Sequence, residues 1–294
     1  TSWSTWEFFA SKDDLQDSTV TDPVTGRRST MLNALNDVLI QAALQGQSMF
    51  AASGDHGAYA SQGHFDFPIS NTLTAEFPAA DPLITAAGGT TLPRGLFEEF
   101  PDEAAWGWDY LFDFPIGTGG GVSSYFPRPA YQLGIPGMLN TEPGQIQITF
   151  ALNDTGGVKP DLRIVLPTNF AGRNIPDLSL NSDPETGYTV FYTSDVTGFS
   201  VIEGFGGTSF ASPQLNGVTA LFDQAFGKRV GLLNFPLYDL ARRNLAYGGA
   251  APPLRDIALG DNWHYTAQPG YDQATGLGVP DFANLLTALK RFIR

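Results

Sequence analysis

The segment GGTSFASP at residues 206–213 combines a residue type and a setting that suit nucleophilic catalysis. A Gly-Gly pair leads into Thr208 and Ser209, and an apolar stretch with helical spacing follows, so Ser209 is expected at a helix N-terminus. Unpaired N–H groups and the positive end of the helix dipole lie there. A hydroxyl in this place can attack a carbonyl carbon while N–H groups receive the developing negative charge. The segment equally fits a serine that only caps a helix after a Gly-rich turn.

The segment FAASGDHGAY at residues 50–59 places an acidic side chain in a loop directly after an apolar run. The run indicates a buried strand, and the loop that follows carries Asp55 and His56. A protonated Asp55 could donate a hydrogen bond to an oxyanion, and burial beside other carboxylates would keep the proton in place. The alternative is a turn aspartate that accepts hydrogen bonds from nearby N–H groups.

Together these two segments resemble the sedolisins, the serine-carboxyl peptidases of the subtilisin clan. Further stretches that match the family, in its order along the chain, are GGTTL (88–92), GGGVSSYFPRPAYQ (119–132), IPDLSLNSDPETGY (175–188) and GYDQATGLGVPD (270–281). The resemblance implies that Ser209 is the nucleophile, that Asp55 stabilises the oxyanion, and that Trp3 and Gly54 border the substrate pocket. His56 departs from the pattern, because the family commonly has a small residue at that position.

The resemblance also implies a base that these 294 residues do not carry. Sedolisins use a glutamate, supported by an aspartate, on a helix upstream of the segment that Ser2-Trp3 matches, here with Ser4 where the family has Gly. A carboxylate that titrates at about 4–5 can accept a proton in acid, where a histidine is already protonated. Glu7 lies too close to the matching segment to be that glutamate. We expect a processed N-terminal chain that stays associated to supply the helix; truncation and a degenerate homologue are the alternatives.

A second constellation near the C-terminus resembles the calcium loop of the sedolisins. The resemblance implies side-chain ligands from Asp256 and Asp272, and carbonyl ligands from Ile257, Gln268 and Gly270, although the family usually has Gly in place of Gln268. All of these are hard oxygen donors, which Ca²⁺ prefers. One structural Ca²⁺ is therefore expected, and the alternative is a Gly-rich turn with two solvated aspartates.

Composition excludes several classes of protein. Thirty acidic against 16 basic residues give a formal charge of −14, which argues against nucleic acid and against anionic membranes as partners. The absence of cysteine excludes disulfides and thiolate metal sites. No stretch is long and apolar enough to span a bilayer, and no signal peptide is visible. We therefore expect a mature or excised fragment that works outside the cell or in an acidic compartment such as the lysosome.

The apolar pattern predicts alternating strands and helices. Residues 29–45 are expected to form a helix, and 48–53 and 82–89 to form buried strands. This rhythm favours an α/β fold, which the resemblance specifies as a single subtilisin-like domain over 1–294, with a mostly parallel sheet flanked by helices on both faces. Catalytic loops then belong at the carboxyl ends of the strands.

The segments between residues 93 and 226 are also expected to form defined elements. Residues 93–118 are expected to form a long acidic surface excursion, and 144–153 to form a strand inserted relative to the family pattern. A hairpin around Gly198 is expected to lead to the nucleophile, with a helix over 209–226 behind it.

The favoured function is an acid-acting endopeptidase that cleaves protein or peptide substrates through an acyl-enzyme on Ser209. Two alternatives stay open. The chain could be a catalytically inactive scaffold or peptide-binding module, or it could be a neutral subtilisin-type hydrolase that uses His56 as its base.

Overall fold

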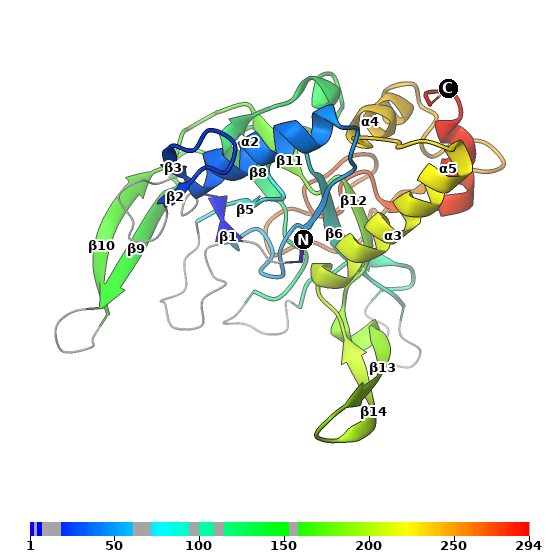
Figure 1. The fold of residues 1–294 in the computed structure, drawn as a ribbon, viewed down its shortest axis with the longest axis horizontal. Coiled ribbons are helices and arrows are strands. Elements are labelled where there is room, and N and C mark those ends of the chain that lie inside the picture. Colours follow the sequence, from blue (N-terminus) through cyan, green and yellow to red (C-terminus); the bar gives the residue numbers. More distant parts are fainter. Residues whose placement is uncertain are drawn as a thin grey trace.

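The computed structural model describes residues 1–2, 5–7, 19–60, 72–93, 100–108, 115–152 and 158–293 (Figure 1). Its central sheet has the strand order β12 (Leu178–Asn181), β6 (Thr85–Thr91), β4 (Phe50–Ala52), and both pairings are parallel. The two expected buried strands are thus confirmed. These strands consist largely of small or apolar buried residues, as expected for a parallel sheet that is covered on both faces.

Helices cover the two faces of this sheet. Side chains alternate between faces along a strand, and successive residues of β4 and β6 accordingly enter two different cores. The first core joins the sheet to α3 (Thr208–Phe226) and contains Phe50, Ala87, Ala211 and Leu215. The second joins it to α2 (Met31–Leu44) and contains Ala51, Ala86, Leu32 and Leu39.

The ends of α2 and α3 follow from local chemistry. Thr30 caps α2, because its hydroxyl accepts a hydrogen bond from the Asn33 N–H at 3.1 Å, and this confirms the helix expected over 29–45. The N-cap of α3 is Gly207, so Ser209 lies inside the first turn and is not itself the cap. Gly227 ends α3 in the left-handed conformation, at φ 66°.

The other elements lie outside the central sheet and its two covering helices. Among the described residues, the further helices are η2 (Ala130–Gln132), η3 (Pro184–Thr186), α4 (Asn234–Arg242) and α5 (Phe282–Leu289). The antiparallel pairs are β1 (Thr5–Trp6) with β5 (Glu76–Phe77), β2 (Thr19–Thr21) with β3 (Arg28–Thr30), β8 (Gly121–Pro127) with β11 (Gly172–Ile175), β9 (Ile146–Leu152) with β10 (Val158–Val165), β13 (Tyr188–Ser194) with β14 (Gly198–Phe205), and β15 (Leu254–Arg255) with β16 (Val279–Pro280).

Two hairpins, β9–β10 and β13–β14, project from the body of the molecule (Figure 1). The first confirms the strand expected over 144–153, and the second confirms the hairpin expected around Gly198. The second hairpin leads through Gly206 and Gly207 into α3.

Residues 93–118 were expected to form a surface excursion, and this prediction is wrong for residues 104–106, which the structure describes as buried. Strand β7 (Ala104–Ala105) pairs with β6, and the Trp106 side chain is only 1% exposed. The Trp106 N–H donates to the Gly89 carbonyl oxygen, which fixes this segment against the central sheet. Residues 94–99 and 109–114 lie outside the described residues. The acidic residues that precede Ala104 suggested an exposed loop, although a short buried strand follows them.

Candidate active site

Asp55 and the start of α3 are joined by hydrogen bonds, although 153 positions separate Asp55 from Thr208. Asp55 follows the carboxyl end of β4, where the sequence predicted a catalytic loop. Its Oδ1 accepts hydrogen bonds from the Thr208 N–H at 2.7 Å and from the Thr208 hydroxyl at 2.9 Å. The Thr208 hydroxyl also accepts a bond from the Gly54 N–H at 3.1 Å. Asp55 is therefore fixed beside the residue that precedes Ser209.

Gly207 lets the two segments approach this closely. Its φ is 91°, a backbone conformation that side chains disfavour, and a Cβ there would lie 2.6 Å from Asp55 Oδ2. Since Oδ1 accepts both bonds from Thr208, Oδ2 is the oxygen that lies toward Gly207. A larger residue at 207 would displace the Asp55 carboxyl from the N-terminus of α3.

Ser209 lies in the first turn of α3 and is partly buried. Its hydroxyl donates to the Ser2 carbonyl oxygen at 3.1 Å, and the Ser2 hydroxyl donates to the Ser209 carbonyl oxygen at 2.9 Å. Thr1 extends this junction, because its carbonyl oxygen accepts bonds from the Ser212 hydroxyl and from the Ala52 N–H. The first residues of the chain thus lie between β4 and α3, next to the candidate nucleophile.

Gly54, the residue before Asp55, is fixed by contacts on several sides. It is buried, and its carbonyl oxygen accepts a bond from the Gly119 N–H at 2.7 Å. The same carbonyl oxygen lies 3.0 Å from the Thr208 hydroxyl, whose single proton it shares with Asp55 Oδ1. Its φ is 112°, and a Cβ there would lie 2.6 Å from Glu76 Oε1. The structure therefore places a buried carboxyl group, that of Glu76, against the residue next to Asp55. Contact of Gly54 with substrate stays a prediction.

The sequence did not reveal that two acidic residues, Glu76 and Glu7, are buried. Glu7 is 1% exposed, and burial raises the pKa of its carboxyl to about 7. The carboxyl accepts hydrogen bonds from the Ser123 hydroxyl and from the Ser124 N–H, both in the GGGVSSYF stretch. An acidic residue between apolar neighbours was the available signal in both cases, in TWEFF for Glu7 and in TAEFP for Glu76.

Other candidate residues lie in different settings. The His56 ring is placed with Nδ1 3.4 Å from the Pro115 carbonyl oxygen, while the Ser209 hydroxyl bonds to Ser2. His264 pairs with Glu142 at 3.0 Å. The predicted substrate residue Trp3, like Ser4 and His64, lies outside the described residues.

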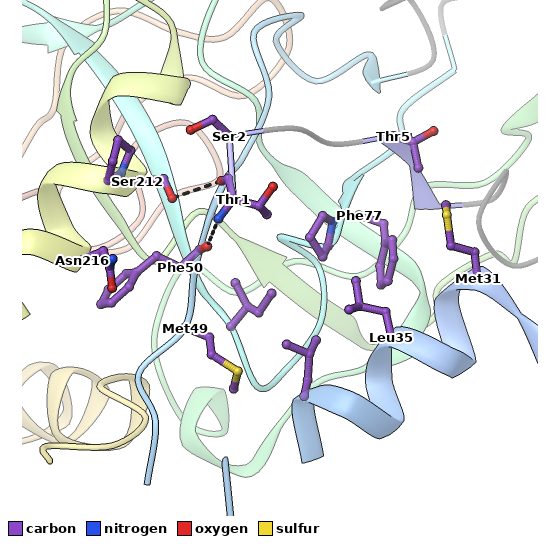
Figure 2. Close-up of a pocket in the computed structure, with 14 residues that line it drawn as sticks. Thr1, Ser2, Thr5, Met31, Leu35, Met49, Phe50, Phe77, Ser212 and Asn216 are labelled. Carbon is purple, nitrogen blue, oxygen red and sulfur yellow. Dashed lines mark hydrogen bonds between the residues drawn. The ribbon is translucent and has the colours of Figure 1, made fainter. Parts of the chain in front are cut away.

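An apolar cavity of about 790 Å³ lies beside Ser2 (Figure 2). Met31 and Leu35 of α2, Met49, Phe50 and Phe77 line it, together with polar groups of Thr1, Ser2, Ser212 and Asn216. Figure 2 also shows the Thr1 backbone nitrogen donating to the Phe50 carbonyl oxygen, at 2.7 Å. The cavity can accept apolar side chains immediately next to the junction of Ser2 with Ser209.

The predicted calcium residues also come together. Asp256 Oδ2 accepts a bond from the Gly270 N–H at 2.8 Å, and Asp272 Oδ2 accepts one from the Gln268 N–H at 3.0 Å. Two aspartates thus bracket the 268–270 turn, and Ile257 is buried beside Asp256. Asp256 Oδ1 is buried and has no hydrogen-bond partner. Burial raises the pKa of Asp272 to about 6.

No helix in the described part of the chain is long and apolar enough to cross a membrane. Within the same residues, no group of three or more His, Cys, Asp or Glu side chains could hold a metal ion. A cation in the 256–272 region would therefore depend on two carboxylates together with backbone carbonyl oxygens.

Comparison with known proteins gives a consistent result, although no protein-family profile matches the chain. It is 34% identical to kumamolisin of Bacillus sp. (strain MN-32) over 268 residues, which cover 87% of this chain and 39% of kumamolisin. It is 30% identical to tripeptidyl-peptidase 1 of Bos taurus, covering 89% of this chain and 40% of the relative. It is 26% identical to sedolisin of Pseudomonas sp. (strain 101), covering 86% and 37%. The chain therefore spans about two fifths of the length of these curated relatives.

A solved structure shares the fold. Pseudomonas sedolisin, described as a serine-carboxyl proteinase complexed with two molecules of pseudo-iodotyrostatin, superposes with a TM-score of 0.69 at 23% identity. The superposition covers 100% of this chain and 65% of the sedolisin chain. The fold is a sedolisin-like α/β fold with a parallel sheet and several helices, and the protein is a homologue of the sedolisin-family peptidases kumamolisin, sedolisin and tripeptidyl-peptidase 1.

Proposed function

We propose that this chain is the nucleophile-bearing part of an acid-acting serine-carboxyl endopeptidase. The observation that carries the proposal is the pair of hydrogen bonds from Thr208 to Asp55 Oδ1, which holds a carboxyl group beside the residue that precedes Ser209. Similarity to sedolisin-family peptidases over most of the chain supports the same assignment. The substrates are proteins or peptides.

In the proposed reaction, the Ser209 Oγ attacks the carbonyl carbon of the scissile bond, and the hydroxyl proton passes to a carboxylate base. A protonated Asp55 donates a hydrogen bond to the resulting oxyanion, aided by the N–H groups at the start of α3. The C–N bond then breaks, the base returns its proton to the leaving amine, and Ser209 carries the acyl group as an ester. Water, deprotonated by the same base, hydrolyses that ester and frees the Ser209 hydroxyl.

The base in this proposal is a glutamate on a polypeptide segment outside these 294 residues, with an aspartate that supports it. Glu7 does not fill the role, because its carboxyl is buried against Ser123 and Ser124. We assign the 294 residues to one catalytic domain. Its low content of basic residues suits work outside the cell or in an acidic compartment, because the chain approaches neutrality as its carboxylates gain protons.

Casein hydrolysis tests the proposal, with both the 294-residue chain and the full-length product of its gene, at about pH 4 and about pH 8. Acid activity that Ser209→Ala abolishes is the expected result. Activity only at the higher pH would favour His56 as the base. A full-length product without Ser209-dependent activity at either pH would leave an inactive scaffold or peptide-binding module. Mass spectrometry of the products separates internal cleavage from release of tripeptides, an activity suggested by the names of several relatives.

The proposal includes one structural Ca²⁺ held by Asp256 and Asp272, with carbonyl oxygens of Ile257, Gln268 and Gly270. The buried Asp256 Oδ1 without a hydrogen-bond partner supports this, because a cation would satisfy it. Calorimetric titration with CaCl₂ near neutral pH should detect one site, and EGTA should lower the Tm. Asp256→Asn keeps an acceptor for the Gly270 N–H but removes the charge, so its Tm should not respond to EGTA. Equal responses of the two proteins would refute the site.

A further inference from the structure

The hairpin formed by β13 and β14 carries many apolar side chains that are exposed to solvent. Its exposed apolar side chains are Phe191, Tyr192, Val196, Phe199, Val201, Ile202 and Phe205. Phe199 is 70% exposed and Phe191 is 66% exposed. Figure 1 shows the hairpin extending away from the rest of the molecule. An apolar concentration of this kind on a projecting ribbon is typical of an interaction site.

Apolar side chains occupy both faces of the hairpin. The register pairs Phe191 with Val201 and Val190 with Ile202, and neighbouring pairs point to opposite faces. On one face the Phe191 and Phe199 rings stack, with their centroids 6.4 Å apart. A ribbon that packed on the body with one face would alternate apolar and polar residues, so this pattern indicates contact with something other than the body.

The base of the hairpin is built into the candidate active site. Tyr188, the first residue of β13, stacks on Phe210 with centroids 5.1 Å apart and an interplanar angle of 6°. Its hydroxyl accepts a hydrogen bond from Gln214 Nε2 of α3 at 3.0 Å. Phe205, the last residue of β14, also lies against Phe210, at 6.0 Å. Phe210 directly follows Ser209, so apolar surface runs from the candidate nucleophile onto the hairpin.

We propose that the β13–β14 hairpin binds apolar, extended stretches of the polypeptide substrate and guides them to Ser209. This inference rests on the proposed function. It names a substrate class: unfolded or extended chains rich in aliphatic and aromatic side chains. In the described part of the chain, β13 and β14 pair only with each other, so each leaves one edge to which an extended substrate can add as a further strand.

The charge of the hairpin favours a polypeptide substrate over an anionic lipid surface and over a second copy of this chain. The only charged residues between 188 and 207 are Asp195 and Glu203, so the hairpin carries no cation that could bind an anionic lipid surface. A second copy would bring two hairpins of the same sign together, each on a chain of formal charge −14. A neutral or basic apolar polypeptide needs no cation on the hairpin and is not repelled by its negative charge.

The test uses Ser209→Ala as the binding protein, so that the ligand is not cleaved. The probe is a short fluorescein-labelled peptide in which Leu and Phe alternate with Thr, and its polar counterpart has Ser at the apolar positions. Phe191→Ser with Phe199→Ser should weaken binding of the apolar peptide about tenfold. Leu44→Ser, at an 84% exposed position of α2, is the matched control and should leave binding unchanged. Equal unfolding midpoints establish that both variants fold.

Three results would overturn the inference. The hairpin variant could bind the apolar peptide as tightly as the control does, or both peptides could bind equally. Sedimentation could instead show a dimer that only the hairpin variant loses, which would assign the surface to a second copy. Failure of the proposed function looks different: Ser209-dependent casein hydrolysis would be absent while the hairpin still bound the apolar peptide. Conversely, hydrolysis without any effect of the hairpin variant would refute this inference alone.

Discussion

Ser2 and Ser209 exchange two hydrogen bonds, each hydroxyl donating to the carbonyl oxygen of the other residue, at 2.9 and 3.1 Å. These residues are 207 positions apart, so the first residues of the chain help to fix the start of α3. The bond from Ser209 also orients the hydroxyl that we assign as the nucleophile. Attack on a substrate requires that this hydroxyl turn from the Ser2 carbonyl toward the base.

Ser209→Ala should separate catalysis from stability. The variant removes the attacking oxygen, so kcat should fall by about 10³-fold or more. It loses only one hydrogen bond of a partly buried group, so the free energy of unfolding should change by about 1 kcal/mol or less. Casein hydrolysis and urea unfolding measure the two quantities. Ser2→Ala is the control, because it loses the reciprocal bond and keeps the nucleophile. Comparable residual activity in the two variants would remove Ser209 from the mechanism.

Asp55→Asn and Asp55→Ala should differ in activity. An asparagine oxygen can still accept the two bonds from Thr208, and its N–H₂ group can face Gly207 and donate to an oxyanion. Alanine loses both functions, so it should lower kcat by about 10²–10³-fold. Asp55→Asn should retain more activity than Asp55→Ala, because its amide can still donate a hydrogen bond to the oxyanion. Profiles of kcat against pH for the three proteins check this. Asparagine as damaging as alanine would contradict the donor role.

Glu7 should make the protein more stable in acid. Its folded pKa of about 7 lies above the ordinary value of 4.5, so the folded state binds the proton more tightly than the unfolded state does. This contribution to stability is fully present below about pH 4.5 and is lost as pH rises to about 7, by about 3 kcal/mol in total. Glu7→Gln should flatten the pH dependence of the unfolding free energy in that window. Asp239→Asn, in an exposed ion pair with Arg243, should not. An unchanged slope in Glu7→Gln would refute the assignment.

Sequence patterns predicted the elements whose structure depends on residues that are close in sequence. The helical spacing over residues 29–45 predicted α2, and the two segments that flank Gly198 predicted the β13–β14 hairpin. The carboxyl end of β4 also predicted where Asp55 would lie. Each of these features depends on residues within a few positions of one another.

Features that depend on long-range pairing could not be predicted in this way. Glu7 is buried because the N-terminal segment pairs with β5, and its N–H donates to the Ala75 carbonyl oxygen. The burial of Trp106 likewise follows from the pairing of β7 with β6. Neither partner is visible in the local sequence, so polar or acidic neighbours favoured an exposed location. Apolar residues lie on both faces of β13–β14, and only the structure shows that these side chains are exposed in the described part of the chain.

Arg173 and Asp177 form a fully buried ion pair, 2.7 Å apart, near the amino ends of β6 and β12. The Arg173 guanidinium also donates to the Ile84 carbonyl oxygen, and Asp177 accepts bonds from the Ala86 N–H and the Tyr238 hydroxyl, both at 2.7 Å. This network ties β6 to the segment that leads into β12. Removing one partner leaves the other charge buried without compensation.

Arg173→Met should therefore lower the free energy of unfolding by about 3–5 kcal/mol, because Asp177 keeps its burial and loses its counterion. Arg243→Met breaks an ion pair with Asp239 in which the Arg243 side chain is exposed, and it should cost about 1 kcal/mol or less. Urea unfolding of both variants at one pH gives the comparison. A loss in Arg173→Met no larger than in Arg243→Met would contradict this expectation. The pair would then not be what holds β6 to β12, and the position of the catalytic loop after β4 would not depend on it.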